Sequence, residues 1–249
     1  MSSSNSDFKQ PQPSPTSRQQ SINMAQPCLD LPPERLSAEV LVKMFDGPRV
    51  TIIVGEEKKV HKLPKLLLCH FSPYFNSCFN MRSKKLSEKE LELPDDKPED
   101  FWMLIEFMLR GAVSDKFLMR KAGDDENVLK ATVSECMDFL EYADKYSMTY
   151  AAEILITEPL KAALPLLKNL GVTGITDTYV ELVYRATRHD SALRRLVVEN
   201  IVSSLGATTL EFAKQEEQIP AFALEMLNQI RELFRRNQIN PGKGRKGIH

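Results

Sequence analysis

The sequence predicts an α+β domain, a small mixed sheet covered by helices, followed by an all-α extension. Residues 50–54 form a β-branched run typical of a strand, and apolar residues at helical spacing lie on both sides of it. Beyond residue 150 the apolar residues recur at helical spacing alone. We therefore place a mixed domain at residues 34–148 and a helical extension at residues 149–236.

The bulk composition is that of an ordinary globular protein. Hydrophobic residues make up 42% of the chain and charged residues 27%, and 33 basic side chains nearly cancel 34 acidic ones. No chain-wide charge attracts nucleic acid or an anionic membrane. The apolar runs are far shorter than the roughly 20 residues of a membrane-spanning helix. We expect neither nucleic acid nor membrane as a direct partner.

The two ends of the chain predict no packed structure. Residues 1–33 are rich in Ser, Gln and Pro, which bury too little apolar area to offset the entropy of ordering, so we expect a disordered arm. They also lack a basic flank before an apolar stretch, so we expect a cytoplasmic or nuclear protein. Residues 237–249 form a basic, flexible tail, whose Lys243, Arg245 and Lys246 could act in nuclear entry or phosphate binding.

The cysteines are too scattered for a disulfide framework. They stand at positions 28, 69, 78 and 136, and in a reducing compartment we expect them to remain thiols. A zinc site built from His61, Cys69, His70 and Cys78 would lack the close paired spacing that such sites use. We expect no metal and no cofactor.

The mixed domain begins with a helix and a hairpin. An apolar stripe at helical spacing predicts a short amphipathic helix, ended by Gly47 and Pro48. The stripe consists of Leu36, Val40, Leu41 and Met44. Residues 50–54 and 59–61, separated by four polar residues, then predict a β-hairpin.

Two short helices follow and meet at Phe71. Leu63, Leu66 and Leu67 share one helical face, and Ser72 with Pro73 predicts a capped start for the second helix. Residues 91–93 alternate in the manner of a strand.

Residues 97–110 predict a central core helix. Asp96 is placed to cap it, and its main apolar stripe is extended by Trp102 and Phe107, so we expect burial on most sides, with Phe101 and Trp102 in the core. Within residues 114–130 the polar GDDEN insertion, residues 123–127, is expected to form a surface loop, and the apolar spacing that begins at Val133 predicts a helix to Ser147.

Three further apolar stripes predict helices in the extension. They are Leu182, Val183 and Ala186; then Leu193, Leu196, Val197 and Ile201; then Ala223, Leu227, Ile230 and Phe234. Pro159 and Pro165 are expected to interrupt the first helix of this region, whereas Pro220 is placed to begin a new one.

Five motifs in the same order resemble the BTB/POZ family across residues 49–147. The motifs are VTIIVG at residues 50–55; VHK, LL and SPYF between residues 60 and 75; LELPDD at residues 91–96; PEDF with LIEFMLRG between residues 98 and 111; and FLEYADKY at residues 139–146. The signature residues are Val50, Gly55, Val60, His61, Leu67, Ser72, Tyr74, Phe75 and Phe101. The resemblance implies a protein-interaction module in which His61 packs in the interior with one backbone hydrogen bond.

Two departures from the family pattern bear on partners. Many members pair an acidic residue before the first core strand with a basic one near the histidine, whereas this chain has Arg49 and Lys62. The aromatic residue that often precedes the Val-His motif is replaced by Lys58 and Lys59. The charged pair cannot form here, and the second strand is more polar than in the family.

The resemblance also suggests two interaction sites. Leu36, Val40, Leu41 and Met44 lie where the family commonly places a helix that packs on a second subunit, although the same stripe could cover the chain's own sheet. Leu86, Ser87 and Glu88 resemble the hydrophobic-x-Glu element by which some BTB adaptors bind a cullin scaffold, or else form a plain polar loop.

The leading hypothesis is a protein-interaction protein that self-associates, or that recruits a partner to a cullin-type ubiquitin ligase. A second hypothesis is a transcription cofactor acting by oligomerisation, which would need a DNA-binding partner because no zinc-finger pattern is present. A third, an enzyme, has the least support because no nucleophile and base pattern, phosphate loop or small-molecule site is visible. The acidic cluster at Glu88, Glu90, Glu92, Asp95 and Asp96 is interpreted as a solvated loop face.

Overall fold

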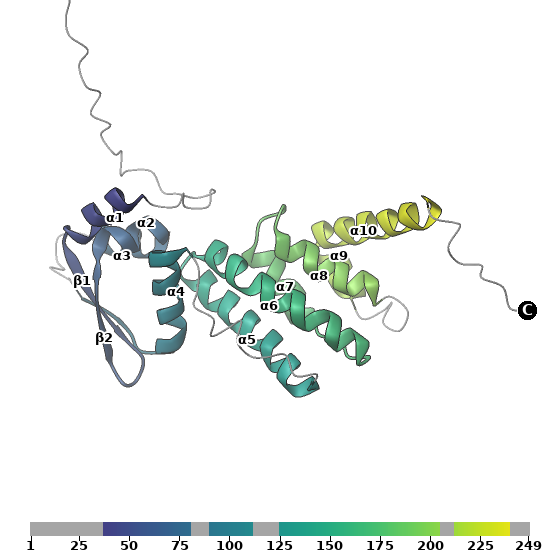
Figure 1. Ribbon diagram of the computed structural model, residues 1–249, viewed down its shortest axis with the longest axis horizontal. Coiled ribbons are helices and arrows are strands. Elements are labelled where there is room, and N and C mark those ends of the chain that lie inside the picture. Colours follow the sequence, from purple (N-terminus) through teal and green to yellow (C-terminus); the bar gives the residue numbers. More distant parts are fainter. Residues whose placement is uncertain (1–36, 81–89, 112–124, 205–211, 240–249) are drawn as a thin grey trace, which may run out of the picture.

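A computed structural model describes residues 37–80, 90–111, 125–204 and 212–239. The sheet and its helices lie at one end of the elongated molecule, and the helices of the extension continue away from it (Figure 1). The mixed part contains α1 (Ala38–Phe45), β1 (Arg49–Val54), β2 (Lys59–Pro64), α2 (Lys65–Phe71), α3 (Pro73–Asn80), β3 (Glu90–Leu93), α4 (Pro98–Arg110) and α5 (Glu126–Lys145). The extension contains α6 (Thr149–Asn169), α7 (Asp177–Ala186), α8 (Ala192–Ser203), α9 (Ala213–Gln218) and α10 (Pro220–Ile239).

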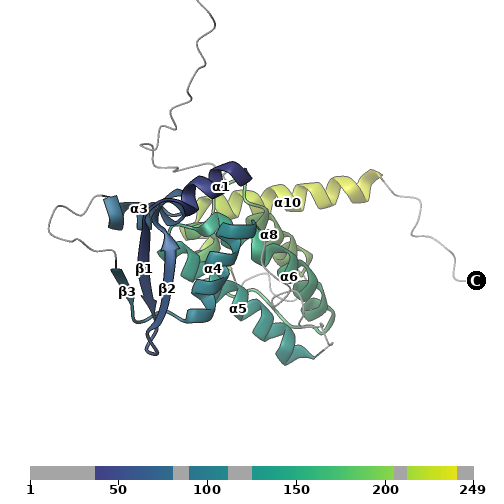
Figure 2. The ribbon, with the colours of Figure 1, turned by 60° about the vertical axis from the view of Figure 1, so that its left-hand side comes forward.

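The sheet is small and mixed, as the sequence predicts. Its strand order is β2-β1-β3, with β2 antiparallel and β3 parallel to β1. Alternate residues of β1, namely Val50, Ile52 and Val54, are buried. Because successive side chains of a strand point to opposite faces, this pattern fixes the face that the helices cover. Figure 2 shows the sheet beside α4.

The start of the second short helix is confirmed at Ser72, whereas Leu63, expected on the first helix, lies in β2 because the strand continues to Pro64. The backbone N–H of Phe75 donates to Ser72 Oγ at 3.2 Å, and Pro73 is the first residue of α3. This is the N-cap arrangement that satisfies a free donor in the first helical turn.

The core helix α4 differs from its prediction at Trp102. Phe101 is fully buried, whereas 55% of Trp102 is exposed. The buried residues of α4 follow a stripe through Phe101, Leu104 and Ile105, and Trp102 lies off this stripe. Its ring instead contacts His61 edge to face, with the centroids 5.3 Å apart. Placing Trp102 in the core was therefore wrong.

The ends of the helices in the mixed domain correct two further predictions. Asp96 does not cap α4, because Lys97 is the N-cap residue and its side chain makes no capping bond. The end of the GDDEN insertion, which was expected to be a loop, is helical from Glu126, since the Asp125 carboxylate accepts a hydrogen bond from the Asn127 N–H at 2.8 Å and caps α5.

Helix α6 continues through both prolines that were expected to interrupt it. Pro159 and Pro165 lie inside a helix of 21 residues. A proline in a helix interior costs about 3 kcal/mol. The packing of α6 on α5 and α8, which buries Ile156, Leu160 and Leu167 completely, outweighs this cost.

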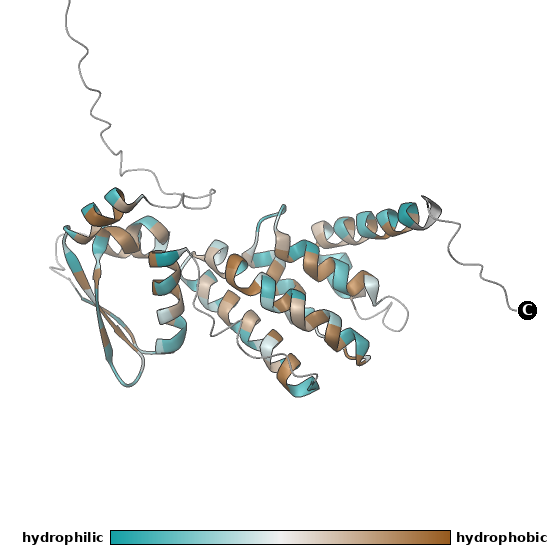
Figure 3. Ribbon diagram, viewed as in Figure 1, coloured by the Kyte–Doolittle hydropathy of each residue, from teal (hydrophilic) through white to brown (hydrophobic). Residues whose placement is uncertain are grey.

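The extension is helical throughout the part that the structure describes, and α10 begins at Pro220 as predicted. The apolar stripe that predicts α10 is only partly the face that packs on the other helices. Phe222 and Met226 are the buried residues of α10, whereas Leu227 and Phe234 are exposed. Figure 3 shows hydrophobic and hydrophilic residues mixed along the helices of the body, and hydrophilic residues along much of α10. Within the described residues no helix is both long enough and apolar enough to span a membrane.

Candidate protein-interaction surfaces

Most signature residues lie in the interior of the mixed domain. Val50, Leu67, Ser72, Phe75 and Phe101 are all buried. Tyr74 is half-buried and packs edge to face on the Tyr146 ring. Val60 is exposed on β2. These residues stabilise the fold, so binding to a partner must depend on other residues.

Gly55 occupies a position that only glycine fits well. Its φ is +74°, and an added Cβ would lie 3.0 Å from the Asp96 carbonyl oxygen and 3.2 Å from the Pro98 ring. Its N–H donates to the Leu93 carbonyl at 2.9 Å, which ties the end of β1 to the end of β3. Glycine therefore allows the loop after β3 to approach β1 closely.

His61 packs against aromatic rings, but the backbone hydrogen bond that the resemblance implies is absent at its buried Nε2. This atom has no partner among the described residues. The imidazole lies 5.3 Å from the centroids of both Phe101 and Trp102. Burial, followed by the nearby Lys59 charge, lowers the pKa of His61 from its ordinary value. The ring is a packing element that is held neutral.

Asp96 forms a polar knot that sequence reasoning did not foresee. Its carboxylate accepts hydrogen bonds from Tyr142 Oη at 3.0 Å, from Lys145 Nζ at 2.6 Å and from Tyr146 Oη. Ser72 Oγ adds a bond to the Tyr146 carbonyl at 2.7 Å. The knot joins the loop after β3 and the start of α3 to the end of α5.

The two tyrosines of this knot are held protonated. Burial raises the pKa of Tyr142 and Tyr146, and the neighbouring Asp96 carboxylate raises both further. Both hydroxyls are donors to the same buried anion, so the arrangement fixes geometry and offers no general base. Asp96 is therefore no part of a solvated acidic loop face.

Helix α1 has one face on the protein and one face in solvent. Met44 is buried, and Val40 and Leu41 are half-buried against the core, so the stripe predicted from the sequence covers the chain's own α2 side. The exposed apolar residues of α1 are instead Val42, at 59%, and Phe45, at 41%. Leu36 lies outside the described residues.

Comparison with known families fits this geometry. Residues 48–162 match the family model of the BTB/POZ domain. The chain contains a BTB/POZ domain. The matched region passes residue 148 and extends into α6, which packs along α5. No curated protein matches the chain.

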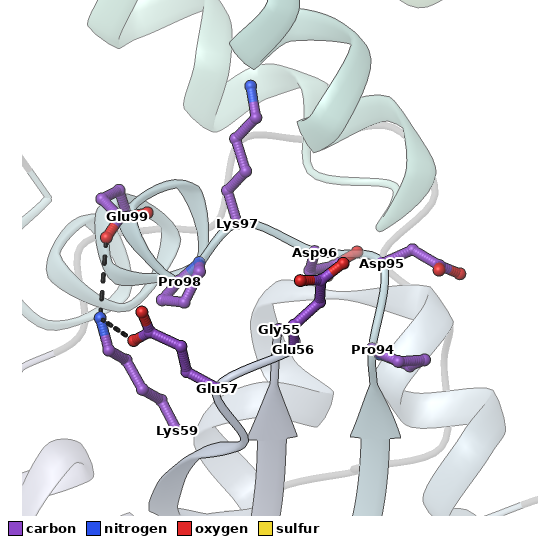
Figure 4. Close-up of a pocket in the computed structure, with 10 residues that line it drawn as sticks. All are labelled: Gly55, Glu56, Glu57, Lys59, Pro94, Asp95, Asp96, Lys97, Pro98 and Glu99. Carbon is purple, nitrogen blue, oxygen red and sulfur yellow. Dashed lines mark ion pairs between the residues drawn. The ribbon is translucent and has the colours of Figure 1, made fainter.

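The BTB domain is a protein-interaction module, and a polar hollow opens beside its sheet. The carboxyl ends of β1 and β3 lie side by side beneath this hollow (Figure 4). Carboxylates of Glu56, Glu57, Asp95 and Glu99 surround it, and Lys59 pairs with Glu57 at 3.4 Å and with Glu99 at 3.8 Å. The lining contains no Ser, Cys or His that could act as a nucleophile.

The remaining candidate sites are the cysteines, a metal site, residues 86–88 and the basic tail. Cys69, Cys78 and Cys136 are free thiols, and burial raises the pKa of Cys136 to about 12. Among the described residues no group of three or more His, Cys, Asp or Glu side chains is placed to hold a metal ion. Leu86, Ser87 and Glu88, together with Lys243, Arg245 and Lys246, lie outside the described residues.

Proposed function

We propose that the protein is a self-associating BTB protein whose α1 helices pack together across a two-fold axis. The observation that carries this proposal is the exposure of Val42 and Phe45 on a helix whose other face is fixed to the core. The two residues are three positions apart, so they lie on the same side of the helix.

A two-fold interface suits this surface because one patch then meets its own copy. Solvent-exposed Val and Phe side chains gain roughly 1.5 to 3 kcal/mol each when fully buried. Glu39 and Lys43 of α1 pair with each other at 2.9 Å in solvent, so neither charge is left isolated when α1 packs on a second copy. Many family members have an acidic and a basic residue at the positions of Arg49 and Lys62. Because both residues are basic here, that charged pair cannot form, and apolar contacts must supply more of the association energy.

The test compares the full chain with the double variant Val42→Asp and Phe45→Asp by size-exclusion chromatography with light scattering. The wild type is expected to associate, and the variant to associate much more weakly. Ile154→Asp, which alters an exposed aliphatic residue on α6, is the matched control and should associate as the wild type does. An association constant that is equal in all three proteins would contradict the α1 interface.

We further propose that the BTB domain recruits a cullin scaffold, with Leu86 and Glu88 as contacts. This role rests on the resemblance of residues 86–88 to the hydrophobic-x-Glu element. Pull-down with purified cullins should recover a complex that is lost when Leu86→Ala and Glu88→Ala are combined. If the double variant still binds the cullin, these residues are not part of the interface. If no cullin binds the wild type, the proposed ligase role is contradicted.

A further inference from the structure

Strand β2 is an edge of the sheet and carries unused backbone hydrogen-bonding groups. Among the described strands it pairs with β1 alone (Figure 2). Directly after β2, the Lys65 N–H donates to the Pro48 carbonyl on the β1 side at 2.9 Å. Because alternate residues of a paired strand bond to the same neighbour, every second residue back to Lys59 faces β1. The N–H and C=O groups of Val60 and Lys62 therefore point away from the sheet.

Pro64 supports this orientation. It is the last residue of β2 and belongs to the same alternate set as Val60 and Lys62. Proline has no N–H to donate, so in an edge strand it is tolerated where that group would face solvent. Val60 and Lys62, which we call the β2 edge, thus offer two donors and two acceptors to a further strand.

Apolar side chains flank the β2 edge on both faces of the sheet. On the inner face the His61 ring contacts fully buried Phe101 on its core side and Trp102, which is 55% exposed, on its solvent side. On the outer face 58% of Val60 is exposed. Directly opposed residues of neighbouring strands have Cβ atoms about 5 Å apart, so a strand added here would cover both exposed side chains.

We propose that the β2 edge is a docking site for an extended acidic segment of a partner protein, which adds a fourth strand to the sheet. Backbone hydrogen bonds supply affinity in this mode of recognition, and alternate side chains supply specificity. The site is separate from the α1 interface and uses none of its residues.

Charge determines the class of partner. Lys62 is exposed and makes no ion pair within the described residues. Lys59, in contrast, is already paired with Glu57 at 3.4 Å and with Glu99 at 3.8 Å. Exposed Arg49 lies on the same outer face of β1, diagonal to Lys62, and adds a second positive charge. A carboxylate on an added strand, opposite Lys62, would therefore be stabilised.

The other acidic and basic residues of the sheet agree with this assignment. Glu90 and Glu92 lie on the outer face of β3, two strands or about 10 Å from β2, so they leave Lys62 available. Lysine on an edge strand also disfavours pairing with a like strand, because the positive charges of two copies approach each other. An acidic segment is favoured over a second copy of β2 for the same reason.

The alternation of the sheet predicts the order of side chains in the partner. The residue opposite Lys62 faces outward and is acidic. The next residue faces inward, beside His61 and Trp102, and the one after lies opposite Val60, so both are apolar. Antiparallel pairing is the more stable arrangement per residue, and in that direction the partner reads acidic, apolar, apolar from its N-terminus.

Synthetic peptides test the proposal on the wild-type full chain. The probe is a fluorescent octapeptide, Ser-Thr-Glu-Val-Val-Thr-Ser-Thr, and its binding is measured by fluorescence anisotropy at low salt. It should bind about fivefold more tightly than the same peptide with lysine in place of glutamate. Methylation of the backbone nitrogens of the glutamate and the second valine removes the donors that face β2 and should abolish binding. Equal binding of the three peptides would overturn the proposal.

Matched variants test the two residues of the β2 edge. Lys62→Glu should reverse the preference, so that the lysine peptide binds more tightly than the glutamate peptide. Val60→Pro removes an outward N–H without breaking a bond to β1 and should lose binding, whereas Val60→Thr keeps the donor and should bind. Lys168→Glu, at an exposed position on α6, is the charge control and should bind as the wild type does. A preference for glutamate that survives in Lys62→Glu would contradict the charge assignment.

Amide hydrogen exchange provides a readout that does not depend on the variants. In the free protein the N–H groups of Val60 and Lys62 should exchange quickly, while those of His61 and Leu63, bonded to β1, should be protected. The glutamate peptide should slow exchange at Val60 and Lys62. Unchanged exchange at both residues would contradict strand addition. A lower molar mass of Val60→Pro than of the wild type would assign the edge to a second copy instead, and would overturn the acidic partner.

Discussion

Lys145 Nζ donates a hydrogen bond to Asp96 Oδ1 at 2.6 Å, across 49 positions of the chain. Only 2% of the Asp96 side chain is exposed, while about half of Lys145 remains in solvent. Tyr142 and Tyr146 complete the set of donors around the carboxylate. The sheet and α5 are therefore held together by a buried anion that has three partners.

Asp96→Asn should lower the free energy of unfolding by about 2 to 4 kcal/mol, because the amide removes the charge that three donors satisfy. Urea denaturation of the purified protein measures this change. Asp95→Asn, at the exposed neighbouring position, should change stability by less than about 0.5 kcal/mol. Equal effects at the two positions would show that the knot contributes nothing specific.

Gly55→Ala should destabilise more than Gly111→Ala. Both glycines have positive φ, at +74° and +67°, so each substitution brings backbone strain of about 1 kcal/mol. Only at Gly55 does the new Cβ also meet the Asp96 carbonyl and the Pro98 ring, whereas nothing lies within 4 Å at Gly111. We expect an additional loss of about 1 to 3 kcal/mol at Gly55, measured by thermal unfolding. Equal losses would contradict the close approach.

The sequence is most informative where local chemistry decides the structure. The β-branched run at residues 50–54 and the Ser72 cap with Pro73 each determine their own element, and both predictions are confirmed. The Asp96 knot could not be foreseen in the same way. Asp96 precedes a proline and two acidic residues, which is typical of a helix cap, and only the folded chain brings α5 close enough to compete for its carboxylate.

Helix faces were predicted less well than helices. An apolar stripe shows that a helix is amphipathic, but the neighbouring helices decide which part of a wide apolar arc is buried. In α10 the buried part is Phe222 with Met226, one side of the arc. In α4 the neighbouring elements likewise bury one side of the apolar arc and leave Trp102 exposed. The apolar residues that remain exposed depend on this packing, so sequence pattern alone does not locate them.

Arg194→Lys should cost about 3 kcal/mol of stability, because lysine cannot reproduce the planar fork of arginine. The guanidinium is buried, donates to Thr187 Oγ1 at 3.1 Å and to the Tyr184 carbonyl at 2.8 Å, and lies 4.5 Å from the Tyr184 ring centroid. Calorimetry measures the loss. Arg195→Lys, at the adjacent exposed position, is the matched control and should be neutral within about 0.5 kcal/mol.

Stability should fall as the solution becomes acidic below about pH 6.5. Burial lowers the pKa of His70 and of His61, so the folded protein keeps both rings neutral where the unfolded chain binds protons. The unfolded state then binds more protons, and the free energy of unfolding decreases as the pH falls through the unfolded value of 6.5.

Replacing both rings, with His61→Phe and His70→Phe, should reduce the change in the free energy of unfolding between pH 7.5 and pH 5.5. These bounds bracket the ordinary histidine pKa of about 6.5. Urea midpoints measured across the range give the slope. A slope as steep as that of the wild type would assign the pH dependence to other groups.

The molar mass of the full chain in solution tests the central claim most directly. One chain has a mass of 28.3 kDa. Light scattering over a range of concentrations should give a mass that rises toward at least twice this value in the wild type, and that falls back when Val42 and Phe45 are both replaced by Asp. A mass of 28.3 kDa at every concentration would contradict self-association.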